Sequence, residues 1–112
     1  MMQYIEQAAN FANKRKDERE FNIGAVGIRS DGAIVQSRNL PHQVRARHVH
    51  AEHRLCKMLD VGATVFVARR TKNGELAMAK PCKNCEITLK RSGVKFVYYS
   101  VGPNKIEKMT LH

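Results

Sequence analysis

Two short motifs in the chain carry residue types that bind metals and move protons. The first is His-Ala-Glu at 50–52, and the second is Pro-Cys-Lys-Asn-Cys at 81–85. Two thiols three positions apart at the start of a helix lie on one face of its first turn, where the positive end of the helix dipole favours negative charge. The imidazole of His50 and the thiolates of Cys82 and Cys85 make three ligands for Zn²⁺ and leave its fourth tetrahedral position open, which is typical of a catalytic zinc.

Glu52 is the candidate for moving protons at this metal. It lies two positions after His50, and side chains two apart on a helix point in different directions, so we do not expect a fourth ligand. A carboxylate beside the metal can take a proton from the activated water and pass it to a leaving group. The sequence therefore predicts one catalytic Zn²⁺ per chain, with Glu52 as its proton shuttle.

A Cys-x-x-Cys pair has other interpretations when it is taken by itself. Redox motifs and structural zinc sites also use it, and a structural zinc would take its fourth ligand from His48 or His53. The chain holds three cysteines, an odd number, which does not indicate a disulfide framework. The third, Cys56, falls on the apolar stripe of a predicted helix, so we expect it in the core.

Length and hydropathy limit the class of protein. With 112 residues and no linker, repeat or low-complexity segment, residues 1–112 are predicted to form a single domain. No apolar run reaches the roughly 18 residues of a membrane-spanning helix, and the first residues lack the pattern of a secretory signal. We therefore expect a cytoplasmic protein without a membrane partner.

The elements that must position the motifs follow from hydrophobic periodicity and from Gly and Pro. The predicted elements, in order, are a helix at 3–16, strands at 22–30 and 33–37 joined by a tight Asp-Gly turn, a helix at 50–62, a strand at 64–68, a helix at 81–92 stopped by Gly93, and a strand at 94–100. Helices packed on a mixed sheet are expected from this order. A further strand at 105–111 must pair antiparallel with 94–100, because too few residues remain for a parallel crossover.

The His-x-Glu and Pro-Cys-x-x-Cys motifs closely resemble the signature of the zinc-dependent cytidine and deoxycytidylate deaminase superfamily. The order of hairpin, His-Ala-Glu helix, Pro-Cys helix and following strand is similar over about residues 20–101. The resemblance implies a cytidine deaminase-like three-layer α/β/α fold with a mixed sheet of about five strands. It also implies a hydrolytic reaction in which zinc-bound hydroxide attacks C4 of cytosine, while Glu52 protonates N3 and then the departing amine.

Substrate contacts are carried over by the same resemblance. Asn39 would contact the sugar or base, and backbone groups around Ala51 and Pro81 would hydrogen-bond the pyrimidine edge. Lys80 stands where many relatives carry Ser, Thr or Glu, so the side chain with which this loop could contact a substrate differs from theirs.

Further contacts are suggested by the residues themselves. Arg45 and Arg47 either form charge-assisted hydrogen bonds to a 5′-phosphate or lie in a solvated loop. Only one of Tyr98 and Tyr99 can face the pocket, because successive strand residues point to opposite faces. Tyr98 is our candidate for stacking on the base.

The predicted function is conversion of the cytosine of a nucleotide or nucleoside to uracil, with dCMP to dUMP as the first choice, a reaction of pyrimidine nucleotide metabolism. His50 as first ligand is similar to the deoxycytidylate, tRNA adenosine and polynucleotide deaminases, whereas an antiparallel last strand resembles the cytidine deaminases. The net charge of +10 favours anionic partners and leaves open a polynucleotide deaminase acting on cytosine or adenine in single-stranded DNA, RNA or tRNA. A non-catalytic, zinc-stabilised nucleic-acid-binding module is a third alternative. A homodimer or homotetramer is implied by the resemblance.

Overall fold

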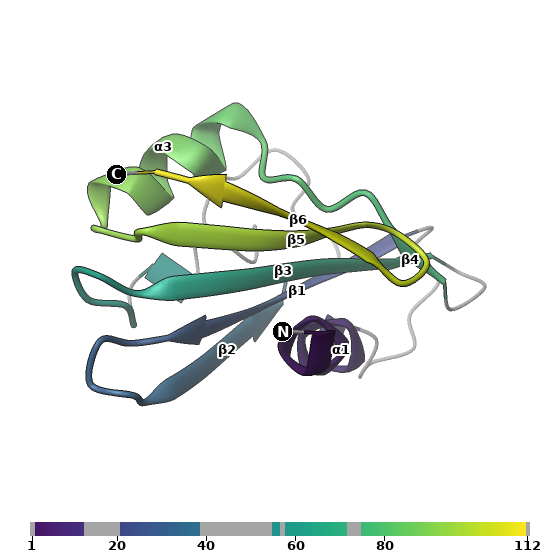
Figure 1. The fold of residues 1–112 in the computed structure, drawn as a ribbon, viewed down its shortest axis with the longest axis horizontal. Coiled ribbons are helices and arrows are strands. Elements are labelled where there is room, and N and C mark those ends of the chain that lie inside the picture. Colours follow the sequence, from purple (N-terminus) through teal and green to yellow (C-terminus); the bar gives the residue numbers. More distant parts are fainter. Residues whose placement is uncertain (1, 13–20, 39–54, 57, 72–74, 112) are drawn as a thin grey trace.

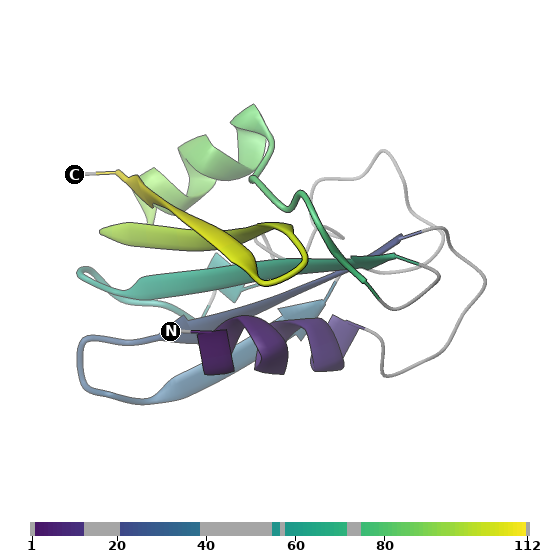
Figure 2. The same ribbon diagram turned by 45° about the vertical axis from the view of Figure 1, so that its right-hand side comes forward.

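A mixed β-sheet with helices on both faces forms the centre of the computed structural model, which describes residues 2–12, 21–38, 55–56, 58–71 and 75–111 (Figures 1 and 2). The elements are α1 (Met2–Ala12), β1 (Phe21–Ile28), β2 (Ile34–Arg38), β3 (Thr64–Thr71), β4 (Leu76–Ala77), α3 (Lys83–Arg91), β5 (Phe96–Gly102) and β6 (Lys105–Thr110). The strand order is β2-β1-β3-β5-β6, with β4 paired to β3. Of the predicted helix at 50–62, residues 50–54 and 57 lie outside the described residues, and 55–56 are helical. The prediction is wrong for 58–62, which form turns and irregular structure: Met58 donates its N–H to the carbonyl of Leu55 at 2.8 Å, an i→i+3 bond that closes a turn.

Strand directions confirm the predicted mixed sheet. β1 is antiparallel to both β2 and β3, β3 is parallel to β5, and β5 is antiparallel to β6. The last hairpin turns at Pro103 and Asn104, and Asn104 adopts a left-handed φ of 58°. The antiparallel last strand is therefore confirmed. The two-residue strand β4 was not predicted, because so short a segment carries no periodic pattern.

Strand β3 separates the two halves of the core. Val65 and Val67 join the cluster that includes Leu89 of α3, whereas Phe66 and Ala68 join the cluster that includes Ile5 of α1. All four of these β3 side chains are buried, which explains why this strand is apolar without alternation. α1 and α3 therefore cover opposite faces of the sheet.

Helix α1 presents an apolar stripe to the sheet. Ile5, Ala8 and Ala9 lie at positions i, i+3 and i+4 and are fully buried. The helix was predicted from 3 to 16; its last residues in that prediction lie outside the described part of the chain. In that part, no helix is long and apolar enough to cross a membrane.

The β1–β2 hairpin has a longer turn than the predicted two-residue Asp-Gly turn. Arg29 donates its backbone N–H to the carbonyl of Ala33 at 2.9 Å, so the loop consists of Ser30, Asp31 and Gly32. Gly32 has a φ of 90° and donates to the carbonyl of Arg29 at 2.9 Å. This is the three-residue hairpin in which a left-handed glycine follows a reverse turn, so Asp-Gly supplies only the last two loop residues.

Side chains tie this hairpin loop to the segment before β3. The backbone N–H of Ser30 donates to Oδ1 of Asp60 at 2.9 Å, and its hydroxyl bonds to the other carboxylate oxygen. Nη1 of Arg29 donates to the carbonyl of Met58 at 2.7 Å. The Ser30 hydroxyl and backbone N–H, helped by the charge of Arg29, hold the pKa of Asp60 below its ordinary value of 3.8.

The end of α3 confirms the predicted stop at Gly93. Ser92 caps the helix, and Gly93 follows with a φ of 88°. The carbonyl of Gly93 accepts the N–H of Gly62 at 2.8 Å, and a Cβ placed on Gly93 would lie 2.8 Å from Cα of Val61. The position therefore requires glycine both for its backbone conformation and for this close approach.

The Gly93→Ala substitution should lower the free energy of unfolding by at least about 1–2 kcal/mol, the cost of a left-handed L-residue, with the contact to Val61 adding to it. Urea denaturation followed by circular dichroism measures this change. Gly102→Ala is the matched control, because a Cβ on Gly102 meets no atom within 4 Å. Equal transition midpoints for the two variants would contradict this account of Gly93.

The Asp60→Asn substitution should destabilise the protein at pH 7, and the difference from the unchanged protein should shrink as the pH falls below 3.8. The reason is that a carboxylate with a lowered pKa contributes stability above its ordinary pKa and loses it on protonation. Urea midpoints at pH 7 and pH 3 measure the effect. The exposed carboxylate variant Glu75→Gln is the control, and a difference that stays constant between the two pH values would speak against the Ser30–Asp60 bonds.

Candidate active site

Two cysteines stand at the start of α3. Cys82 is the N-cap residue, with extended backbone angles (φ −65°, ψ 164°) and an exposed side chain that makes no capping hydrogen bond. Its carbonyl accepts the N–H of Glu86 at 2.8 Å, which begins the hydrogen-bond ladder of the helix. Cys85 lies in the first turn and is fully buried. One thiol therefore faces outward from the cap while the other is enclosed by the fold.

The sequence predicted that Pro81 opens the helix. In the structure, Pro81 instead precedes the cap residue. The helix begins at Lys83, because the extended backbone of Cys82 places that residue at the cap position and Pro81 one position before it. Pro81 is buried, and its fixed φ restricts how the chain enters the helix. The two thiols are still three positions apart at one helix end, so the predicted spacing is retained.

The donors present at this end of α3 fit a zinc ion. Neither cysteine forms a disulfide, and Zn²⁺ favours thiolate sulfur together with imidazole nitrogen. Among the residues that the structure describes, no third His, Cys, Asp or Glu joins them in a metal-binding group. Cys56 also forms no disulfide; it is half-buried and packs against the core cluster on the α3 side of the sheet, in agreement with a core role.

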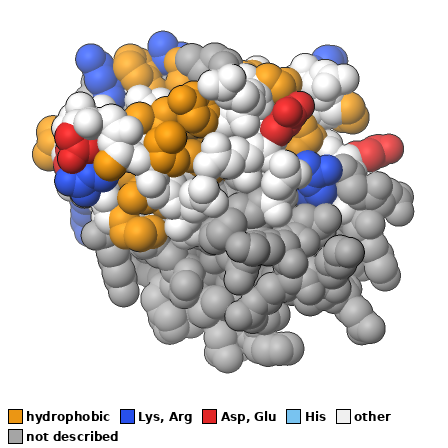
Figure 3. Space-filling view, turned by 90° about the horizontal axis from the view of Figure 1, so that it is seen from below, with side chains coloured by type: hydrophobic (Ala, Val, Ile, Leu, Met, Phe, Trp, Pro, Cys, Tyr) orange, Lys and Arg blue, Asp and Glu red, His pale blue; other side chains and the backbone are white. Residues whose placement is uncertain are grey.

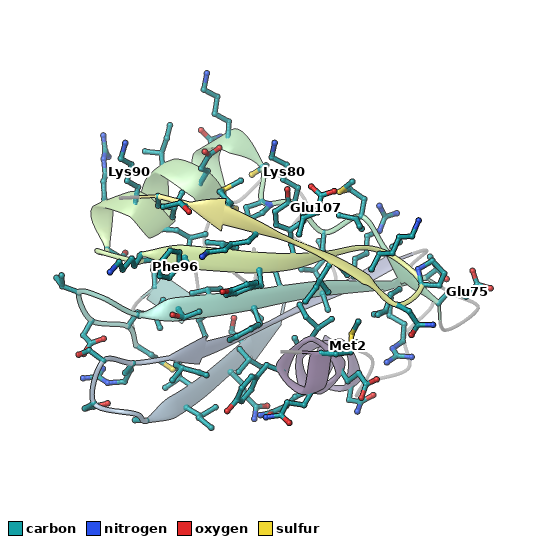
Figure 4. The ribbon with its side chains drawn as sticks, viewed as in Figure 1. Met2, Glu75, Lys80, Lys90, Phe96 and Glu107 are labelled. Carbon is teal, nitrogen blue, oxygen red and sulfur yellow. The ribbon has the colours of Figure 1, made fainter. Side chains whose placement is uncertain are left out.

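The fold places the thiols at a position suited to ligand binding. α3 follows β3 and precedes the parallel strand β5, so its N-terminus lies near the carboxyl ends of these two strands (Figure 1). In α/β sheets, ligands bind outside the carboxyl ends of parallel strands. The segment before the helix is held there, because Ala79 donates its N–H to the carbonyl of Ser100 on β5 at 2.8 Å. Lys80 is exposed on that segment (Figure 4).

Tyr98 lies on the other face of the sheet. Its ring stacks on Phe66, with centroids 5.1 Å apart and an interplanar angle of 11°, and it packs against the α1-side core. Tyr99 instead faces α3, is 6% exposed and donates its hydroxyl to Glu107 at 3.3 Å. Burial and the neighbouring carboxylate of Glu107 raise the pKa of Tyr99. The sheet lies between Tyr98 and the two cysteines, so within one chain the Tyr98 side chain does not reach the thiols.

The remaining predicted site residues lie outside the described part of the chain. They are the third ligand, the proton shuttle and four substrate contacts, namely His50, Glu52, Asn39, Arg45, Arg47 and Ala51. Of the residues predicted from sequence, the structure therefore brings together Pro81, Cys82 and Cys85.

The described residues on the face seen in Figure 3 form no single basic patch. Viewed from below the orientation of Figure 1, Lys and Arg side chains are interspersed with acidic and hydrophobic ones over the described residues.

Comparison with known proteins agrees with the motif. Residues 1–101 match the family described as the cytidine and deoxycytidylate deaminase zinc-binding region. Among solved structures, the chain is similar to a cytidine deaminase from Burkholderia pseudomallei, with a TM-score of 0.67 at 16% identity, covering 98% of this chain and 91% of that one. A mutant cytidine deaminase from Mycobacterium tuberculosis gives a TM-score of 0.55 at 18% identity, covering 92% and 89%. A search of curated proteins found no significant match.

The two structural similarities agree with the three-layer fold that the sequence predicted, and the family match includes both motifs. The match covers 101 of 112 residues, from before the hairpin to the next-to-last residue of β5. The chain belongs to the cytidine and deoxycytidylate deaminase family and is a zinc-dependent hydrolytic deaminase that acts on a C–N bond of cytosine.

Proposed function

We propose that the chain deaminates the cytosine of a free nucleotide or nucleoside, with dCMP, which becomes dUMP, as the first substrate. The observation that carries this proposal is the pair of thiols at the N-terminus of α3, near the carboxyl ends of β3 and β5. Family membership supplies the reaction class, and the thiol pair supplies two of the three ligands that such a zinc needs.

The zinc would be held by His50, Cys82 and Cys85. When bound, Zn²⁺ lowers the pKa of its water to about 7 and so provides a nucleophile at neutral pH. Two thiolates and a neutral imidazole offset the charge of the metal, and the N-terminus of α3 contributes its positive dipole end.

Glu52 would move the protons of the reaction. It would accept a proton from the attacking water and deliver it to N3 of the base, and then accept the proton of the new hydroxyl group on C4 and transfer it to the departing amino group. The oxygen of water forms a bond to C4, the bond between C4 and the exocyclic nitrogen breaks, and ammonia and uracil are the products.

The last hairpin supports a small substrate. β6 returns antiparallel to β5 after a short turn at Pro103 and Asn104, and this arrangement resembles the free-nucleoside cytidine deaminases. A 5′-nucleotide would need a cation for its phosphate, and Arg45 and Arg47 are the candidates. Whether Arg45 and Arg47 bind a phosphate therefore determines whether the substrate is a nucleotide or a nucleoside.

A polynucleotide deaminase is the second candidate, and the net charge of +10 favours it. Tight binding of an oligonucleotide that weakens steeply as the salt concentration rises would indicate a polynucleotide deaminase. A homo-oligomeric state and a cytoplasmic location stay predictions.

Ammonia release and the mass of the uracil product should show turnover of dCMP well above turnover of a cytosine-containing single strand, with cytidine, deoxycytidine and CMP completing the panel. Glu52→Gln should lower kcat by at least about 100-fold, because general acid–base catalysis contributes that much or more. Glu6→Gln, an exposed carboxylate on α1, is the control and should keep full activity. Turnover confined to the single strand would transfer the proposal to the polynucleotide class, and Glu52→Gln with full activity would refute the role of Glu52.

Removal of either thiol should remove the zinc. Cys82→Ala and Cys85→Ala should each bind substantially less than one zinc per chain after dialysis, because two protein ligands hold Zn²⁺ far less tightly than three. Metal analysis of the purified protein measures this stoichiometry. Cys56→Ala is the matched control, since the half-buried Cys56 thiol is not a predicted ligand, and it should keep one zinc per chain. Loss of zinc from this control alone would exclude the predicted ligand set.

A further inference from the structure

Ser100 lies where two parallel strands separate. Residues 64–67 of β3 pair with residues 96–99 of β5, and the pairing stops there. Beyond this point, Arg69 of β3 pairs with Ala77 of β4 instead. Ser100 is the next residue of β5, so it stands at the fork into which β4 inserts.

The side chain of Ser100 bridges the two strands of the fork. Its hydroxyl accepts the backbone N–H of Arg69 at 3.3 Å and donates to the carbonyl of Ala77 at 2.6 Å. These are the two residues that the β3–β4 register pairs with one another. The carbonyl of Ser100 also accepts the N–H of Ala79 at 2.8 Å. One fully buried residue thus fixes β3, β4 and the segment that follows β4.

That segment leads directly to Cys82. Only Lys80 and Pro81 separate Ala79 from Cys82, and each extended residue spans at most about 3.3–3.6 Å. The proline fixes its own φ and restricts the backbone of Lys80 before it. The position of Cys82 therefore depends closely on where Ala79 is held.

The two cysteines differ in what holds them. Cys85 lies within the helix and is enclosed by the core, so α3 itself fixes its place. Cys82 is exposed at the cap, and its side chain makes no capping hydrogen bond. Of the two thiols, Cys82 is therefore the one whose position depends more on the preceding segment.

We propose that Ser100 is a positioning residue for the zinc centre, acting through the segment 77–81 to hold Cys82 where a metal ligand is needed. The proposal rests on the proposed ligand set. Groups that orient metal ligands from outside the coordination shell change metal affinity by about 10- to 100-fold when they are removed. Ser100 would act in this way through the backbone before Cys82.

Chelator competition on the zinc-loaded full chain tests the proposal. Ser100→Ala should bind zinc about 10- to 100-fold more weakly than the unchanged protein, and the visible spectrum of the cobalt-substituted protein should change. Two controls separate this from a general loss of stability. Ser92→Ala removes a hydroxyl that donates to the carbonyl of Thr88 at 2.9 Å at the far end of α3, and Val97→Ala opens the buried core of β5. Both controls should keep zinc affinity and the cobalt spectrum.

Amide hydrogen exchange of the unchanged protein provides a second test that does not depend on a variant folding. Because coupling between two sites is reciprocal, zinc loading should slow exchange at the amides of Arg69 and Ala79, which donate to Ser100, more than at Gly62, which donates to Gly93. Uniform protection of all three amides would overturn the proposal.

The outcomes also separate this proposal from the proposed function. An unchanged protein that binds no zinc would refute the ligand set itself. A protein that binds zinc while Ser100→Ala keeps the same affinity, or while Val97→Ala loses as much affinity as Ser100→Ala, would refute only the role of Ser100.

Discussion

The parallel pairing of β3 with β5 is the constraint on which the rest of the structure depends. Parallel neighbours cannot be joined by a tight turn, so the chain must cross over between them, and this crossover contains β4, residues 78–82 and α3. The crossover brings the N-terminus of α3 near the carboxyl ends of both strands. The thiols of Cys82 and Cys85 lie at this edge because the helix begins there.

Burial on both faces of the sheet sets which side chains can reach the thiols. Along β5, Val97 and Tyr99 pack toward α3, so Tyr98 must point toward α1, where it stacks on Phe66. A shift of one residue in register would exchange these faces and expose the core. The apolar packing that stabilises the sheet therefore also limits the set of residues that can contact a substrate.

The two thiols at the start of α3 are held in different ways. Cys85 is held by helix and core, whereas Cys82 stands at the cap and relies on the segment anchored to Ser100. Sequence reasoning did not single out Ser100. The available signal was one polar residue within an otherwise apolar strand, and such a residue becomes informative only when its hydrogen-bond partners on β3 and β4 are known.

The sequence by itself determined the features that depend on neighbouring residues. The spacing of the two cysteines, the stop of α3 at Gly93 and the antiparallel β6 follow from helix geometry, backbone conformation and chain length, and all three are present. The tertiary structure alone decided the strand β4, the cap position of Cys82 and the face of Tyr98. These depend on contacts between segments far apart in the chain: which strand pairs at the end of β3, how the crossover is anchored, and which face each core covers. Local patterns carry no information on such pairings, because the energy that selects them arises only when the sheet and both helices pack together.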